Sequence, residues 1–302
     1  MSEPTRCGYV AFLGAPNAGK STLVNALVGQ KVSIVTPKVQ TTRFRVLGIA
    51  LRGPAQMMCV DTPGIFAPRR RLDRAMVRAA WQGSADADLR VLLVDAVEFA
   101  KGRAGEAMRI AESLGRAGKS AILALNKTDA ADKGALLVAA ERLNAACPFV
   151  ETFMISALTG DGVEDLARYL VQRLPEGPWL YPADQTADIP VRLLAAEITR
   201  EQLFMKLRQE LPYALTVETE EWQEREDGSA RVEQIVYVQR ERQKPIVIGE
   251  GGHQIKSVGA AARAEIERVL GRRIHLFLTV KVREDWADDP RRFRAMGLEF
   301  DA

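Results

Sequence analysis

Eight residues of this 302-residue chain, from Gly14 to Ser21, limit the folds open to it more than any other feature. They match the pattern G-x-x-x-x-G-K-S/T, with the apolar run Tyr9–Leu13 before them and the helical spacing of Lys20–Val28 after them. Between a strand and a helix, the glycines of this pattern let successive backbone N–H groups face a phosphate at the helix N-terminus. The run therefore predicts a phosphate-binding α/β domain at the start of the chain.

The rest of the first half alternates apolar, strand-sized runs with stretches of helical spacing. We expect strands at Tyr9–Leu13, Phe44–Leu51, Met57–Val60, Val91–Asp95, Ala121–Asn126 and Phe149–Ile155. We expect helices at Lys20–Val28, Leu72–Gln82, Gly105–Arg116, Gly134–Asn144 and Val163–Arg173. Strands and helices in this order predict a mostly parallel, doubly wound sheet with helices on both faces.

The alternation ends where four prolines between positions 175 and 190 prevent a long helix or a central strand. We therefore predict a first domain over 1–175, a linker over 176–190 and a second domain over 191–302. The second domain is expected to contain a helix at Val191–Glu210, strands at Ala214–Trp222 and Arg231–Arg240, a turn at Gly249–Gly252, a helix from about Ile255 to Leu270 and a strand at Ile274–Val282. This α-β-β-α-α-β order, in which a further helix precedes the glycine turn, predicts a smaller α+β domain.

Composition excludes several classes of protein. With 47% hydrophobic and 27% charged residues, the chain is neither collagen-like nor disordered throughout. None of its apolar runs approaches the ~20 residues of a membrane-spanning helix. The net charge of +3 is too small to indicate a polyanion partner by itself. The three scattered cysteines, Cys7, Cys59 and Cys147, predict buried free thiols in a reducing cytoplasm rather than a disulfide framework.

Polar motifs follow the ends of three predicted strands, where ligands of such sheets bind. Asp61–Gly64 reads D-x-x-G, in which the carboxylate can hold Mg²⁺ through water and the Gly64 N–H can contact a γ-phosphate. Asn126–Asp129 reads N-K-x-D, and Asp129 can accept hydrogen bonds from the ring N–H and exocyclic amine of guanine, which adenine lacks. Ser156–Leu158 follows the next strand and can supply a backbone N–H to the guanine oxygen. Together these motifs predict GTP or GDP as the ligand.

With these motifs, the first half resembles the translation-factor class of P-loop GTPases. The resemblance implies that Asn17 helps to hold a monovalent cation, usually K⁺, beside the phosphates. It also implies that Thr42, with Thr41 as the alternative, closes over the γ-phosphate and ligates Mg²⁺. Small signalling GTPases orient the attacking water with a glutamine after the D-x-x-G glycine, whereas this chain has Ile65 there. Because an apolar side chain cannot orient water, we expect slow hydrolysis that depends on K⁺ and on a rearranged switch loop rather than on a glutamine.

The site residues expected in the first half form three overlapping sets. The nucleotide is expected to contact Gly14, Asn17, Ala18, Gly19, Lys20, Ser21, Thr22, Asn126, Lys127, Asp129, Ser156, Ala157 and Leu158. The residues assigned to catalysis are Asn17, Lys20, Thr42, Asp61 and Gly64. The residues assigned to Mg²⁺ are Ser21, Thr42 and Asp61.

The second half carries a G-x-x-G turn, Gly249–Gly252, between two expected helices. Such a turn lets the backbone of a single-stranded nucleic acid approach closely, and flanking aliphatic side chains form a groove for unstacked bases. The turn and its α-β-β-α-α-β setting resemble a type II K-homology domain. The residues expected to bind RNA are Ile248, Gly249, Glu250, Gly251, Gly252, Ile255 and Lys256.

Taken together, the two halves closely resemble the Era family of bacterial ribosome-assembly GTPases, from Gly8 to about Phe300. The resemblance implies that the GTP-bound protein binds the 3′ end of 16S rRNA and promotes late maturation of the small (30S) ribosomal subunit. It implies that RNA in turn stimulates GTP hydrolysis. It also implies a cytoplasmic monomer, with a peripheral contact to the inner face of the cytoplasmic membrane in some members.

The charges of the second half depart from a simple RNA-binding pattern. In the K-homology domains that this half resembles, the two variable positions of the turn usually include a basic residue. Here they are Glu250 and Gly251. From Gln185 onward there are 19 basic and 21 acidic residues, so we expect a local basic stripe that includes Lys256 and a modest dependence of RNA binding on salt. Two alternatives remain open: an RNA chaperone with incidental GTP turnover, and a GTPase of the same subgroup that assists tRNA modification.

Overall fold

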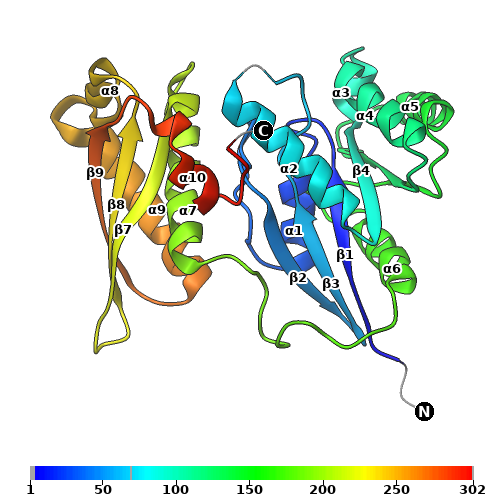
Figure 1. The fold of residues 1–302 in the computed structure, drawn as a ribbon, viewed down its shortest axis with the longest axis horizontal. Helices are drawn as coiled ribbons and strands as arrows, with labels where there is room; N and C mark the ends of the chain where they lie inside the picture. The colour runs from blue at the N-terminus through cyan, green and yellow to red at the C-terminus, as the bar shows by residue number, and fades with distance from the viewer. Residues whose placement is uncertain (1–3, 69, 301–302) are drawn as a thin grey trace. The chain divides into compact units, whose positions relative to one another are not determined.

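The computed structural model describes residues 4–68 and 70–300, which form two compact units (Figure 1). Unit 1 contains the described residues up to Ser33, then Val39–Asp188 and the end of the chain from Met296. Unit 2 contains Ile34–Lys38 and Ile189–Ala295. The segment Ile34–Lys38 therefore belongs to unit 2, although the residues before and after it in sequence belong to unit 1.

Unit 1 is built on a six-stranded sheet with the strand order β2-β3-β1-β4-β5-β6. The strands are β1 (Arg6–Leu13), β2 (Val46–Arg52), β3 (Ala55–Asp61), β4 (Leu89–Asp95), β5 (Ile122–Asn126) and β6 (Thr152–Met154). β2 runs antiparallel to β3, and every other neighbouring pair is parallel. The prediction of a mostly parallel sheet is confirmed.

Helices cover both faces of this sheet (Figure 1). They are α1 (Lys20–Val28), α2 (Arg71–Ala85), α3 (Ala96–Ala100), α4 (Gly105–Arg116), α5 (Lys133–Ala146) and α6 (Val163–Arg173). Successive strand residues point to opposite faces, so Leu93 packs in a core with α1 and α6 while Leu92 packs in a second core with α4 and α5. The doubly wound arrangement predicted from the alternation is therefore confirmed.

The structure corrects several predicted bounds in unit 1. The strand expected at Phe149–Ile155 is reduced to β6, because this edge strand pairs with β5 over three residues only. The strand expected from Phe44 begins at Val46. The short helix α3 was not predicted, because five residues are too few to show helical periodicity.

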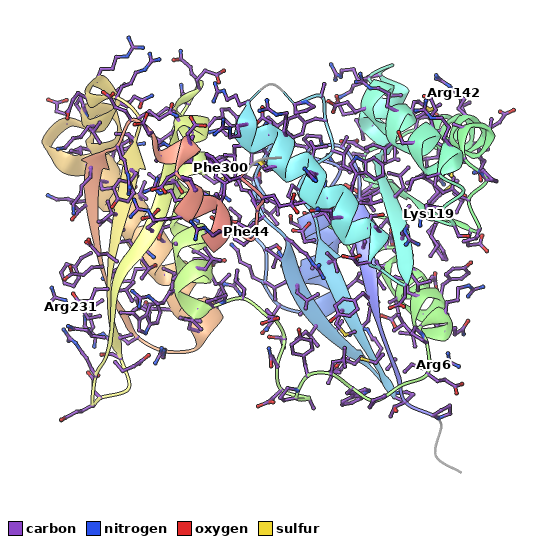
Figure 2. All side chains as sticks on the ribbon, in the orientation of Figure 1. Arg6, Phe44, Lys119, Arg142, Arg231 and Phe300 are labelled. Carbon is purple, nitrogen blue, oxygen red and sulfur yellow. The ribbon has the colours of Figure 1, made fainter. Side chains whose placement is uncertain are left out.

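The proline-rich segment predicted as a linker is hydrogen-bonded to unit 1 over part of its length. Arg6 at the start of β1, labelled in Figure 2, donates to the carbonyl of Leu174 at 2.6 Å, just before this segment. Further on, the N–H of Ile49 on β2 donates to the carbonyl of Thr186 at 2.8 Å. The residues paired with β2, 186–188, lie between Pro182 and Pro190, so no proline has to donate a hydrogen bond to this edge strand.

Unit 2 has the predicted α-β-β-α-α-β order. Its elements are α7 (Val191–Lys206), β7 (Leu215–Glu224), β8 (Ala230–Val238), α8 (Lys244–Ile248), α9 (His253–Leu270) and β9 (Ile274–Val282), followed by α10 (Pro290–Ala295). The three strands form one sheet in the order β7-β8-β9, with β8 and β9 parallel. Side chains of α7, α9 and the three strands share two apolar clusters, which form the core of this unit.

Several predicted bounds in unit 2 also change. α7 ends at Lys206 rather than at Glu210, and a short 3₁₀ turn containing Pro212 precedes β7. α9 begins at His253, directly after the glycine turn, and α10 was not predicted. Within the part of the chain that the structure describes, no helix is both long and apolar enough to cross a membrane. Cys7, Cys59 and Cys147 are buried free thiols, as predicted.

Candidate functional site

The loop between β1 and α1 requires glycine at its last position. Gly19, at the N-terminal end of α1, has φ of 98°, and a Cβ added there would lie 2.3 Å from Nδ2 of Asn126. A side chain at this position would therefore be strained and would also displace Asn126. The glycine thus brings the phosphate loop against the end of β5.

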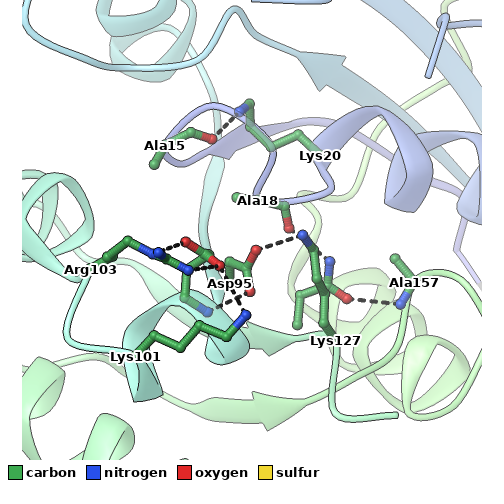
Figure 3. A network of polar contacts seen from close by, with 10 residues as sticks. Ala15, Ala18, Lys20, Asp95, Lys101, Arg103, Lys127 and Ala157 are labelled. Carbon is green, nitrogen blue, oxygen red and sulfur yellow. Dashed lines mark hydrogen bonds and ion pairs between the residues drawn. The ribbon is translucent and has the colours of Figure 1, made fainter. Parts of the chain in front are cut away.

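Lys20 is almost completely buried at the first turn of α1. Its ammonium donates to the carbonyl of Gly14 at 3.1 Å. It also donates to the carbonyl of Ala15 at 3.0 Å (Figure 3). Burial lowers the pKa of Lys20 to about 8, against the opposing attraction of Asp61 and Glu106. A buried ammonium ringed by carbonyl oxygens is well suited to exchange them for phosphate oxygens, which carry full negative charge.

Three oxygen-bearing side chains meet beside Lys20. Ser21 Oγ donates to Asp61 Oδ2 at 2.6 Å and lies 2.9 Å from Thr42 Oγ1, which is itself 3.4 Å from Asp61 Oδ2. Asp61 is fully buried, and its Oδ1 has no hydrogen-bond partner among the described residues. Burial raises the pKa of Asp61, and its hydrogen bond from Ser21 partly offsets this.

These donors suit Mg²⁺, a hard cation that prefers oxygen ligands. A positive ion would satisfy the orphaned Asp61 oxygen and reverse the effect of burial on the carboxylate. The structure brings Thr42, the first choice of the two neighbouring threonines, to the predicted metal residues Ser21 and Asp61.

The loop after β3 lies against the phosphate loop. A Cβ added to Gly64 would lie 2.9 Å from the backbone nitrogen of Pro16, so only glycine allows this approach. The N–H of Ile65 donates to the carbonyl of Gly14 at 3.0 Å, and the Ile65 side chain is buried in an apolar cluster. This residue therefore contributes packing at the position where a polar group could have oriented water.

Asn126 connects the two loops that flank the predicted base pocket. Its Nδ2 donates to the carbonyl of Ala18 at 2.8 Å, and its Oδ1 accepts the N–H of Ala157 at 2.9 Å (Figure 3). The Ala157 N–H is therefore already hydrogen-bonded to Asn126. A guanine oxygen that accepts from the same N–H would share it with Asn126. Lys127, the next residue, forms an ion pair with Asp95, in which Nζ lies 2.5 Å from Oδ2. The sequence motifs did not identify Asp95 as a site residue.

Two predicted base contacts are exposed to solvent. Asp129 presents an exposed side chain on the turn after β5. Leu158 is 80% exposed, whereas its neighbour Ser156 is buried and caps the loop by accepting the N–H of Thr159 at 3.1 Å. Leu158 can therefore contribute through its backbone, and its side chain is free to lie beside a ligand.

The glycine turn of unit 2 has backbone angles that exclude other residues. Gly249 has φ of 74° and ψ of 166°, and a Cβ added there would lie 2.6 Å from Cβ of Gln254. Gly251 and Gly252 also have positive φ, at 57° and 77°. Glu250 is exposed at the tip of the turn. The backbone between α8 and α9 is therefore bare and accessible.

The apolar residues around this turn divide into two groups. Ile248 and Ile255 are partly buried, so each has a surface left for a base. The sequence places Val258 beside Ile248 and Ile255 as a third candidate to line the groove, but the structure buries it completely in the core with α7 and the sheet. Lys256 is exposed on the first turns of α9, and Ile246 on α8, which the sequence reading missed, is 59% exposed.

The segment Ile34–Lys38 is built into unit 2 by three kinds of contact. Ile34 is buried in an apolar cluster with residues of α7. The N–H of Val35 donates to Oε1 of Glu201 at 2.8 Å. The ammonium of Lys38 donates to the carbonyls of Phe204 and Leu207 at the C-terminal end of α7, where the helix dipole favours a cation. Sequence patterns gave no sign of these contacts.

The fold and these sites define a class of protein: a P-loop GTPase domain followed by a K-homology domain. The family described as "50S ribosome-binding GTPase" matches residues 9–127, and the family described as "KH domain" matches residues 210–287. GTPase Era from Brucella suis is 58% identical over 297 residues, which cover 98% of this chain and 94% of the relative. GTPase Era from Dinoroseobacter shibae is 57% identical and is covered to 97%. The chain belongs to the GTPase Era family and is a GTPase.

Solved Era structures match both units. A single-residue variant of Aquifex aeolicus Era bound to GDP and AlF4⁻ is 37% identical, with a TM-score of 0.89 over 97% of this chain and 99% of that one. Era in complex with MgGDPNP and nucleotides 1506–1542 of 16S ribosomal RNA is 38% identical, with a TM-score of 0.90 over the same shares. The similarity therefore extends over the entire architecture rather than over one domain.

Proposed function

We propose that this GTPase binds the 3′ end of 16S rRNA through its K-homology unit and assists maturation of the 30S ribosomal subunit in a nucleotide-dependent way. The observation that carries the proposal is the match, over 97% of the chain, to an Era structure that holds MgGDPNP and nucleotides 1506–1542 of 16S rRNA. The bare backbone of the Gly249–Gly252 turn supports it, because single-stranded RNA needs such close access.

In the proposed nucleotide site, each group acts through a contact that its chemistry allows. Lys20 leaves the loop carbonyls for the β- and γ-phosphates, and Asp129 selects guanine through two accepted hydrogen bonds. Mg²⁺ would be held by Ser21, Thr42 and, through water, Asp61, and when bound it neutralises charge on the phosphate oxygens. The Gly64 N–H completes the γ-phosphate contacts.

The nucleotide state is proposed to reach unit 2 through the segment Ile34–Lys38. This segment is anchored on α7 by Glu201 and by the Lys38 ammonium, and Lys38 precedes Thr42 by four positions. When Thr42 closes over the γ-phosphate, the short connection from Lys38 to Thr42 limits the positions that the segment Ile34–Lys38 can take. GTP and GDP then favour different populations of the two units, and the RNA surface is presented in one of them.

Replacing Asn17 tests the proposed K⁺ dependence. Asn17 has φ of 62°, so Asn17→Ala removes the amide and also adds strain, whereas Asn17→Gly removes the amide without strain. We expect both variants to lose the stimulation of GTP hydrolysis by KCl over NaCl at equal ionic strength, measured as phosphate release. An unchanged KCl-to-NaCl ratio in the glycine variant would rule out a cation role for Asn17.

The RNA surface is proposed to combine the turn, the partly buried Ile248 and Ile255, and the exposed Lys256. Glu250 adds a negative charge at the tip of the turn, and Lys256 is the one basic side chain of this proposed surface. Because few basic side chains then contact the RNA backbone, RNA affinity should fall only modestly as the salt concentration rises. A cytoplasmic location, a monomeric state and a peripheral contact with the membrane remain expectations from the resemblance.

Crosslinking tests the proposed partner directly. The full chain, loaded with a non-hydrolysable GTP analogue, is crosslinked to 30S subunits, and the attached RNA nucleotides are mapped. We expect the crosslinks of unit 2 to concentrate at the 3′ end of 16S rRNA. Crosslinks spread over the subunit, or concentrated elsewhere, would contradict the proposal.

A further inference from the structure

Asp95 is an acidic residue at the base pocket that none of the nucleotide motifs contains. It ends β4, and the parallel register of β4 and β5 places it beside Asn126. Its Oδ1 accepts the N–H of Glu98 at 3.1 Å and so caps α3. Its Oδ2 accepts a hydrogen bond from the ammonium of Lys127 at 2.5 Å (Figure 3). One carboxylate thus joins the end of β4 to the base-recognition motif after β5.

Lys127 needs an external contact to hold one conformation. Its backbone has φ of 68°, which is uncommon for a residue with a long side chain. Its side chain is 37% exposed, whereas that of Asp95 is only 13% exposed. A lysine this exposed can adopt many rotamers, and a largely buried carboxylate at its tip selects among them.

Neighbouring charges leave the Asp95 carboxylate available for Lys127. The other acidic side chain of α3, Glu98, is engaged by Arg103 at 2.5 and 2.9 Å and by Lys101 at 3.5 Å. These two cations contact Glu98, while the Lys127 ammonium reaches Asp95 (both residues of this second pair are labelled in Figure 3). The two groups of cations therefore use different carboxylates, Glu98 on α3 and Asp95 at its N-cap.

We propose that Asp95 is a positioning residue for guanine recognition, which acts by fixing the side chain of Lys127. With its ammonium held by Asp95, the four-carbon stem of Lys127 keeps one path from the end of β5 to Asp95. An ordered aliphatic stem can cover the face of a planar base, since lysine buries its stem while its charged end stays polar. The inference rests on the proposed nucleotide pocket and adds a group that sets its affinity.

Asp95→Asn isolates this role. Asparagine caps a helix as well as aspartate does, so α3 keeps its N-cap while the charge that holds Lys127 is lost. We expect the Kd of GDP and the KM for GTP to rise about three- to tenfold, as for loss of one partly exposed charged hydrogen bond, with a far smaller change in kcat. Glu98→Gln, which touches Arg103 and Lys101 instead, should leave the Kd of GDP unchanged.

Repeating the Asp95→Asn substitution in a Lys127→Met variant shows whether Asp95 affects the Kd of GDP through Lys127. In Lys127→Met, which keeps an unbranched apolar stem without the ammonium, adding Asp95→Asn should change the Kd of GDP less than twofold. An unchanged Kd in Asp95→Asn alone, or an equally large effect in the Lys127→Met background, would overturn the inference. The wild-type chain provides the separate test of the pocket: a failure to prefer GDP over ADP would contradict the proposed nucleotide site, whatever Asp95 does.

Discussion

Asp129→Asn should weaken GTP binding about a hundredfold and raise the affinity for xanthosine triphosphate. Asp129 accepts two hydrogen bonds from guanine in the proposed pocket, and losing hydrogen bonds to a charged group costs about 3 kcal/mol in total. The amide of asparagine offers a donor where xanthine carries an oxygen, so the preference between the two bases should reverse. Competition with a fluorescent guanine nucleotide measures both affinities.

A matched control exists within the same loop. Asp132 caps α5 by accepting the N–H of Ala135 at 3.1 Å, and asparagine can do the same. Asp132→Asn should therefore keep the wild-type preference for GTP. If Asp129→Asn also kept that preference, the assignment of guanine selection to Asp129 would be wrong.

Gly249→Ala should reduce RNA affinity by more than tenfold while GTP hydrolysis without RNA stays at the wild-type rate. At φ of 74° and ψ of 166° this position lies in a region that is essentially restricted to glycine. The added Cβ would meet Cβ of Gln254 at 2.6 Å and its backbone nitrogen at 2.9 Å, so the start of α9 must shift. A displaced turn can no longer approach the RNA backbone. Binding to an oligonucleotide of the 16S 3′ end measures the loss.

Gly271→Ala separates crowding at the turn from general strain. Gly271 also has a positive φ, of 65°, at the opposite end of α9, but a Cβ added there has no heavy atom of the described chain within 4 Å. This variant should lose some thermal stability, by about 1 kcal/mol, and keep its RNA affinity. RNA binding that fell equally in both variants would mean that stability, rather than the geometry of the turn, sets the affinity.

Much of the fold was predictable because local patterns and the tertiary structure agree. The strands that contain Phe12 and Leu93 are continuous apolar runs, which is typical of central strands buried on both faces. The phosphate loop was predictable for a different reason: Gly19 must be glycine because its Cβ would collide with Asn126. In both cases the local conformation and the long-range contacts favour the same residue types.

What the sequence did not reveal depends on contacts between distant segments. The ion pair of Asp95 and Lys127 depends on the register of β4 and β5, which no local pattern reports. The anchoring of Val35 by Glu201 joins residues 166 positions apart. Val258 was misassigned because a helix position next to the turn can face either the core or the groove, and here it faces the core.

The affinity of the full chain for a 16S 3′-end oligonucleotide, compared between GDP and a non-hydrolysable GTP analogue, tests the central claim most directly. If the segment Ile34–Lys38 transmits the nucleotide state, the analogue should tighten RNA binding at least tenfold, which corresponds to about 1.4 kcal/mol of coupling. Equal affinities with the two nucleotides would contradict nucleotide gating and would favour an RNA chaperone with incidental GTP turnover.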